Sequence, residues 1–70
     1  MRREQVESSA IASVGYAPET AVLEIEFVDG GQYRYYAVPP SVHRALMDAD
    51  SVGQAFITTI RDRYPTERIG

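Results

Sequence analysis

The chain has 70 residues, a length that leaves room for one domain. Seven arginines and no lysines stand against ten acidic residues, so the formal net charge is −3 at pH 7. This balance disfavours strong non-specific binding to nucleic acid or anionic lipid, but it leaves room for a local basic patch. The absence of cysteine excludes disulfides and thiolate metal sites. No apolar run approaches the length of a transmembrane helix, and no signal-peptide stretch follows the charged N-terminus, so we expect a cytoplasmic protein without a membrane partner.

The first predicted strand contains Ile11, Val14 and Tyr16, with an irregularity such as a bulge expected at Gly15. Residues 17–20, Ala-Pro-Glu-Thr, predict a turn because proline suits its second position. We therefore expect the chain to reverse direction into the segment that follows.

A β-hairpin is predicted over residues 22–38. Apolar side chains at 23, 25 and 27 alternate with glutamates at 24 and 26, which is the pattern of a half-buried strand. Asp-Gly-Gly at residues 29–31 supplies the turn, and the returning strand ends at two prolines.

The length of this turn decides the register. A three-residue loop with Gly31 in the left-handed region would pair Glu26 with Arg34. It would also place Tyr33 and Tyr35 on the buried face. A two-residue loop would set Tyr33 opposite Glu26 and turn Arg34 toward the core. We prefer the three-residue loop because it buries apolar groups and pairs opposite charges.

Two helices close the chain. Pro39 or Pro40 suits the first turn of the first helix, whose apolar stripe is formed by residues 42, 45, 46 and 49. The second helix begins at Ser51, which forms a capping box with Gln54, and Pro65 ends it. Its buried stripe is predicted to be Ala55, Phe56, Thr59, Ile60 and Tyr64.

The order of these elements predicts an α+β fold, a three-stranded antiparallel β-meander followed by two α-helices packed on one face. Residues 8–65 would form this single domain, and residues 1–7 and 66–70 would be flexible termini. The edges of the first and third strands would then be open to a partner.

Short motifs follow one another from about residue 8 to residue 64: Ser9-Ala10-Ile11, Val14-Gly15-Tyr16, Leu23-x-Ile25-x-Phe27, Gly31-x-Tyr33-x-Tyr35, Val38-Pro39, Ser51-x-Gly53, Phe56 and Ile60-Arg61. The ordered set resembles the KTSC domain family, named for a domain at the C-terminus of some lysyl-tRNA synthetases. The hallmark of that family is a Tyr-x-Tyr motif, here Tyr33-Arg34-Tyr35. The resemblance implies a stand-alone bacterial domain with no established activity and no catalytic residues to carry over. RNA binding has been suggested for the family from its attachment to a tRNA synthetase.

The tyrosines are the first candidates for a binding role, because aromatic rings on a sheet can stack single-stranded bases. The preferred register places Tyr33 and Tyr35 in the core, where packing explains them. Tyr36 lies on the opposite face beside Arg34, and this exposed pair could stack a base. The two glutamates of the preceding strand share that face and would repel phosphate.

Arginines near the end of the second helix are better candidates for phosphate contact. Arg61 and Arg63 form this group, Arg68 follows in the tail, and Arg44 on the first helix could extend it. The alternative is that these arginines complement the dipole at the C-terminus of the helix.

Other residues give no catalytic or metal-binding pattern. His43 is the single histidine, and no spacing supplies further metal ligands or a triad. Backbone amides after Ser51 could bind an anion near Gly53, but capping explains this serine, and Asp48 and Asp50 lie just upstream. We expect no enzyme, cofactor or metal, and we expect Gly15, Ser51, Gly53 and the two motif tyrosines to be structural.

Two functional hypotheses remain. The first is a small RNA-associated module that contacts a tRNA-like partner through Arg34, Tyr36, Arg44, Arg61 and Arg63. The second is a protein-interaction or self-association module that uses an open sheet edge or the exposed surface of Val22, Val28 and Tyr36. A contiguous arginine surface would favour the RNA hypothesis, and scattered arginines, each paired to an acid, would weaken it.

Overall fold

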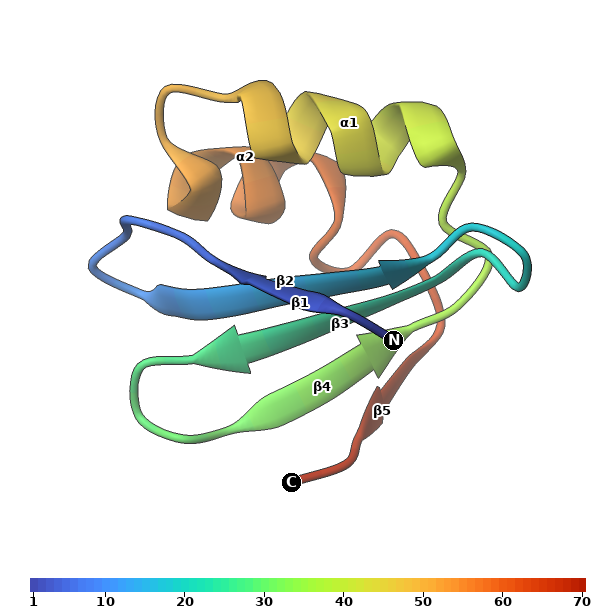
Figure 1. The fold of residues 1–70 in the computed structure, drawn as a ribbon, viewed down its shortest axis with the longest axis horizontal. Coiled ribbons are helices and arrows are strands. Elements are labelled where there is room, and N and C mark those ends of the chain that lie inside the picture. The colour runs from blue at the N-terminus through green and yellow to red at the C-terminus, as the bar shows by residue number, and fades with distance from the viewer.

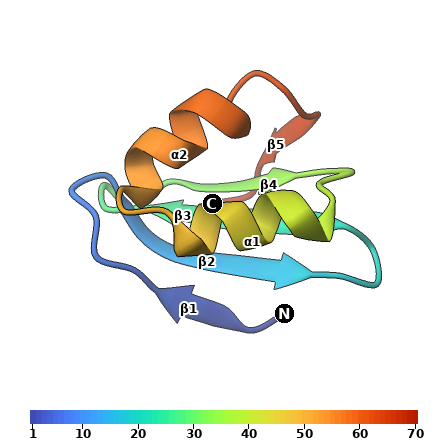
Figure 2. The same ribbon diagram turned by 90° about the horizontal axis from the view of Figure 1, so that it is seen from above.

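The structure, a computed structural model, describes the whole chain from Met1 to Gly70. Five antiparallel strands lie side by side in chain order, and both helices cover one face of the sheet (Figure 1, Figure 2). This arrangement confirms the α+β class and the two helices. Neither helix has the length and apolar character needed to cross a membrane. The elements are β1 (Arg3–Gln5), β2 (Ile11–Ala17), β3 (Val22–Phe27), β4 (Gln32–Tyr35), α1 (Pro40–Asp48), α2 (Val52–Thr59) and β5 (Thr66–Arg68).

The prediction of three strands was wrong, because a short strand is added at each edge of the sheet. β1 pairs with β2, where Arg3 lies opposite Gly15, and β5 pairs with β4, where Arg68 lies opposite Tyr33. Both segments lie in the predicted flexible termini. A three-residue strand is too short to show an alternating pattern, and it forms because its neighbour offers unpaired backbone groups. The edges of β2 and β4 are therefore covered, and the free edges belong to β1 and β5.

The β3–β4 hairpin has a three-residue loop, but the loop begins one residue earlier than predicted. Gly30, and not Gly31, adopts a positive φ, of 97°. The loop thus comprises residues 28–30, and Arg34 lies opposite Glu24 in the ladder. Because this register differs from the predicted one by two residues along the strand, every side chain keeps its predicted face.

The irregularity in β2 lies at Ala12 and not at Gly15. The β2–β3 register shifts between Ile11 and Ser13, so Ala12 is an extra residue in the ladder. This bulge explains the spacing of the apolar residues, since it lets Ile11 and Val14 face the helices although they are three positions apart. Both are only 1% exposed.

The sequence correctly predicts where both helices begin, but it predicts too late an end for α2. Pro40 is the first residue of α1, and the Ser51 hydroxyl accepts a hydrogen bond from the Gln54 amide at 3.2 Å at the start of α2. The second helix ends at Thr59, earlier than predicted. Asp62 adopts a φ of 64°, which turns the chain away from the helix and toward β5.

The core lies between the sheet and the two helices. The Tyr16 hydroxyl at its margin donates to the Val38 carbonyl at 2.6 Å and so ties β2 to the segment before α1. Ala45 and Thr59, predicted to face the core, are exposed. The buried apolar residues are Ile11, Val14, Leu23, Ile25, Tyr35, Val38, Leu46, Val52, Phe56 and Ile60.

Candidate functional site

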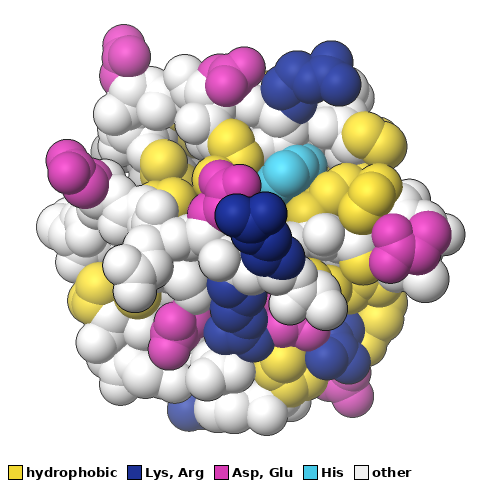
Figure 3. All heavy atoms as spheres, in the orientation of Figure 1, with side chains coloured by type: hydrophobic (Ala, Val, Ile, Leu, Met, Phe, Trp, Pro, Cys, Tyr) yellow, Lys and Arg dark blue, Asp and Glu magenta, His cyan; other side chains and the backbone are white.

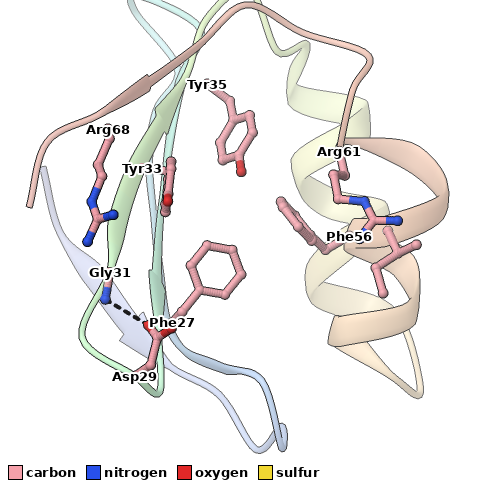
Figure 4. Close-up of a pocket in the computed structure, with 9 residues that line it drawn as sticks. Phe27, Asp29, Gly31, Tyr33, Tyr35, Phe56, Arg61 and Arg68 are labelled. Carbon is pink, nitrogen blue, oxygen red and sulfur yellow. Dashed lines mark hydrogen bonds between the residues drawn. The ribbon is translucent and has the colours of Figure 1, made fainter.

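A groove of about 400 Å³ opens between helix α2 and the helix-facing side of β3 and β4 (Figure 4). Because side chains alternate along a strand, Tyr33 and Tyr35 share this side of the sheet with Phe27. Both tyrosines of the Tyr-x-Tyr motif therefore belong to the wall of the groove. The lining residues are Phe27, Asp29, Gly31, Tyr33, Tyr35, Phe56, Ile57, Arg61 and Arg68.

Four aromatic rings form the inner wall of the groove. Phe27 meets Tyr33 and Phe56 edge to face, with ring centroids 5.6 Å apart in each pair. Phe56 also meets Tyr35 edge to face at 5.5 Å. These are preferred geometries for aromatic pairs. The contacts hold the rings in place before any ligand arrives, which lowers the entropy that binding must remove.

The two motif tyrosines supply the hydroxyl groups of this wall. Tyr35 is only 5% exposed, whereas Tyr33 is half-buried. Neither hydroxyl has a hydrogen-bond partner within the chain, unlike those of Tyr16 and Tyr36. In Figure 4 the Tyr35 hydroxyl points into the space between the phenylalanine rings. Burial raises the pKa of Tyr35, and the neighbouring Tyr33 adds to the effect, so this hydroxyl stays protonated and can donate or accept.

Two arginines border the groove, one from each side. The Arg68 guanidinium on β5 lies over the Tyr33 ring, 5.6 Å from its centroid. Arg61 follows α2, its side chain is 57% exposed, and its nearest acidic group is that of the adjacent Asp62 at 3.9 Å. A pair this exposed contributes little free energy. Most of the hydrogen-bonding capacity of Arg61 is therefore available to a ligand.

The remaining predicted arginines do not form one surface with this groove. Arg63 borders a shallow hollow that it shares with Arg61 at the end of α2. Arg44 lies elsewhere, beside Tyr16 and His43 on the α1 side. The face shown in Figure 3 carries basic side chains next to acidic ones over the strands, with no continuous basic surface. The structure thus brings Arg61 and Arg63 together and leaves Arg44 apart.

Arg34 and Tyr36, the predicted stacking pair, lie on the open face of the sheet. Arg34 donates two hydrogen bonds to Glu24, and the Tyr36 hydroxyl donates to Glu67 at 2.6 Å. Both side chains are therefore engaged by carboxylates. Val28, placed on the same predicted surface, lies in the exposed hairpin loop.

Several groove residues were not predicted from the sequence as binding residues. Phe27 and Phe56 were expected to be core residues only, and Asp29 and Gly31 were interpreted as turn residues. Arg68 is named among the arginine candidates because of its charge, but its place in the fold differs from the predicted loose tail, since β5 brings it across from Tyr33. Nothing in the sequence predicts this pairing, because a three-residue strand shows no alternating pattern.

Gly15 and Gly53 each lie close to a neighbouring segment of the chain. A Cβ at Gly15 would lie 2.9 Å from the Met1 sulfur and 3.0 Å from Cγ of Arg3, because the N-terminal segment pairs beside it. A Cβ at Gly53 would lie 3.3 Å from the Ser8 hydroxyl, which accepts from two backbone amides. Close approach of neighbouring chain segments is a structural reason for glycine at both positions.

His43 packs against Tyr16 with the two rings stacked, their centroids 4.4 Å apart. Burial lowers the pKa of His43, while the charge of Glu4 opposes this shift. No group of three His, Cys, Asp or Glu side chains is arranged to hold a metal ion.

Residues 7–64 match the sequence model of the KTSC domain. An uncharacterized protein of Stutzerimonas stutzeri is 52% identical over 64 residues, which cover 91% of this chain and 90% of that protein. The crystal structure of a KTSC domain protein from Yersinia pestis superposes with a TM-score of 0.96 at 39% identity, covering 99% of this chain and 97% of the other.

A longer relative contains a similar segment. The lysine–tRNA ligase of Nostoc punctiforme is 40% identical over 63 residues, which cover 90% of this chain but only 11% of the ligase. This chain is therefore similar to a small part of that enzyme.

Proposed function

Because this chain belongs to the KTSC domain family, whose Tyr-x-Tyr motif here lines an aromatic groove, we propose that it is a non-catalytic module that binds single-stranded RNA. One unpaired base would enter the groove. The adjoining phosphates would contact Arg61 and Arg63 at the end of α2. The observation that carries the proposal is the combination, in one groove, of two partly exposed aromatic rings (Phe27 and Tyr33) backed by the buried Tyr35 and Phe56, two tyrosine hydroxyls without a partner in the chain, and an arginine that is largely free.

The aromatic wall supports a base as the occupant. Every nucleobase has a π-face, and stacking on an aromatic side chain contributes about 1–3 kcal/mol per base. The exposed part of the Tyr33 ring provides a flat surface at the mouth of the groove, and the Ile57 side chain, which is 42% exposed, adds an apolar contact beside it. The hydroxyls of Tyr33 and Tyr35 supply hydrogen bonds that a purely apolar ligand would leave unused.

The arginines support a backbone contact beside that base. Arg61 borders both the groove and the neighbouring hollow that contains Arg63. Two successive phosphates on either side of one bound base could therefore meet two guanidinium groups. Arginine is well suited to phosphate because its planar fork donates two parallel hydrogen bonds.

The relatives support RNA over other polyanions. A segment 40% identical to this chain forms part of a lysine–tRNA ligase, an enzyme whose name specifies tRNA as a substrate. The net charge of −3, the pairing of Arg3 and Arg34 with Glu24 and the absence of a continuous basic surface mean that RNA would have to bind locally, through the groove and its two nearby arginines. We therefore expect weak affinity with a small salt dependence.

The test is an amide chemical-shift titration of the labelled domain with single-stranded RNA pentamers and with tRNA. Shifts should centre on Tyr33, Phe56 and Arg61. With two phosphate contacts, affinity should fall about fivefold between 50 and 150 mM salt. No shifts at low salt, where an electrostatic contact is strongest, would overturn the proposal.

Two charge variants assign the contact to a surface. The double substitution Arg61→Ala with Arg63→Ala should weaken binding strongly, whereas Arg44→Ala should leave it unchanged because Arg44 lies outside the groove. All three side chains are exposed, so both variants should fold. Loss of binding in Arg44→Ala alone would move the contact to the α1 side and contradict the groove assignment.

A second candidate is a protein-interaction module, and the exposed apolar side chains near the hairpin favour it. Val28 is 60% exposed and Ile57 is 42% exposed. A peptide could lay an apolar side chain in the same groove. Shifts that appear with a partner protein but not with RNA, and that persist at high salt, would support this candidate instead.

A further inference from the structure

The end of the groove next to the β3–β4 loop carries an arrangement of polar groups that suits one base in particular. We propose that Asp29 and Arg68 read the Watson–Crick edge of the bound base and make the groove selective for guanine. This inference rests on the proposed function, because it assumes that a base occupies the groove.

Asp29 presents a fixed and largely unused carboxylate. Its Oδ1 accepts a hydrogen bond from the Gly31 amide at 2.9 Å, as the dashed line in Figure 4 marks. This bond orients the side chain across the turn and leaves Oδ2 free. No salt bridge engages the carboxylate. Asp29 is also the one acidic residue that lines the groove.

Arg68 provides a donor next to this acceptor. A Cβ placed on Gly31 would lie 3.3 Å from Oδ1 of Asp29 and 4.0 Å from Nη2 of Arg68. Both groups therefore border the same small space above Gly31, and the two remain too far apart to form a salt bridge with each other. Glycine keeps this space open, since any side chain at position 31 would fill it.

Guanine is the base that complements this pair. Its Watson–Crick edge presents, in order, two adjacent donors, the 2-amino group and N1–H, and then the O6 acceptor. The Asp29 carboxylate can accept both donors, one at Oδ2 and one at the second lone pair of Oδ1, and a guanidinium beside it can donate to O6. Adenine and cytosine each offer a single amino donor beside a ring-nitrogen acceptor, and uracil offers one N–H between two carbonyls. Each of the other three bases would therefore place an acceptor against Asp29.

The rest of the groove agrees with this orientation. With its edge at Asp29, the plane of the base would lie against the aromatic wall. In Figure 4 Arg61 lies across the groove from Asp29, so the sugar and phosphate would leave toward the arginine end. The chemistry at the two ends thus differs, with base reading at the hairpin loop and backbone contact at the end of α2.

The experiment compares four pentamers, each with one G, A, C or U between uridine pairs, by titration at fixed salt. The G pentamer should bind about tenfold more tightly than the U pentamer, as expected for one bidentate base contact. Asp29→Asn should abolish this preference, because the amide nitrogen would meet the guanine donors with donors of its own. The Asp29→Asn variant should still bind the U pentamer with the weaker affinity of the wild type.

A matched control is Glu19→Gln, which removes an exposed carboxylate in the turn at the opposite end of β3 and should leave the preference unchanged. Equal binding of all four pentamers, with shifts still in the groove, would overturn the guanine assignment and leave the proposed function standing. A preference for guanine that survives Asp29→Asn would overturn the role of Asp29. If no pentamer binds, the proposed function fails, and the base assignment fails with it.

Discussion

Arg34 donates two hydrogen bonds to a single carboxylate oxygen of Glu24: its Nε and Nη2 lie 3.0 and 2.7 Å from Oε2. Arg3 donates to the other oxygen, Oε1, at 2.6 Å. The Glu24 side chain is 9% exposed, while those of Arg3 and Arg34 are 29% and 37% exposed. One carboxylate therefore joins β1, β3 and β4 on the face of the sheet that no helix covers.

Replacing this carboxylate should destabilise the fold. Glu24→Gln keeps the shape of the side chain but leaves two arginines without their charged acceptor, and we expect a loss of about 1–3 kcal/mol in the free energy of unfolding. Urea denaturation at pH 7 measures it. The matched control is Glu26→Gln, whose carboxylate accepts one bond from Ser13, and it should cost clearly less. Equal costs would show that the arginine pairs add nothing.

The same carboxylate predicts an acid-sensitive stability. Burial by itself raises the pKa of Glu24, but the hydrogen bonds from Arg34 and Arg3 outweigh it, so the pKa is lowered from its ordinary value of 4.5. The stabilisation is therefore present above that value and is lost as the pH falls through the lower folded-state pKa. In urea denaturation between pH 5 and pH 3, the wild type should lose more stability than Glu24→Gln. Parallel pH profiles would contradict this.

His43 should make the folding stability depend on pH in a second, higher range of pH. Its pKa is lowered from 6.5, chiefly by burial, so the unfolded chain takes up a proton before the folded one does. Its contribution is present above pH 6.5 and declines as the pH falls through the folded-state pKa. Stability should thus decrease from pH 7 to pH 5 in the wild type, and His43→Gln should flatten that slope. NMR titration of the imidazole would report the pKa directly.

Gly30 should be the sensitive glycine of the β3–β4 loop. Its φ of 97° disfavours a side chain, so Gly30→Ala should cost about 1–2 kcal/mol. Gly30→Asn should cost less, because asparagine tolerates positive φ better than alanine does. Thermal unfolding ranks the two variants. If alanine is tolerated as well as asparagine, the loop does not use residue 30 in this conformation.

Ser51 should stabilise the start of α2 by capping it. Ser51→Ala removes the acceptor for the Gln54 amide, and we expect a cost of about 1 kcal/mol. Ser41→Ala is the matched control, because Ser41 is also exposed near the start of a helix but makes no side-chain hydrogen bond to the backbone there. A difference of zero between the two variants in chemical denaturation would argue against the cap.

The local features of this fold could be predicted from the sequence because each depends on a few neighbouring residues. Alternation at Leu23, Ile25 and Phe27 predicted both a strand and the face it buries. Ser51 predicted where α2 begins. The odd number of residues in the hairpin loop predicted which face of the sheet Tyr33 and Tyr35 occupy. Even a register that was wrong by two residues left these faces unchanged, since side chains repeat every two positions along a strand.

Long-range backbone pairing and packing were decided by the tertiary structure alone. β1 and β5 are three residues long and show no pattern, so their place in the sheet depends on the free edges of β2 and β4. Pairing of β5 with β4 brings Arg68 over Tyr33, and packing of α2 on the sheet brings Phe56 and Arg61 to the same groove. The chemistry of each element follows from its own residues. Which side chains from distant elements share one groove was determined only when the sheet and helix closed on each other.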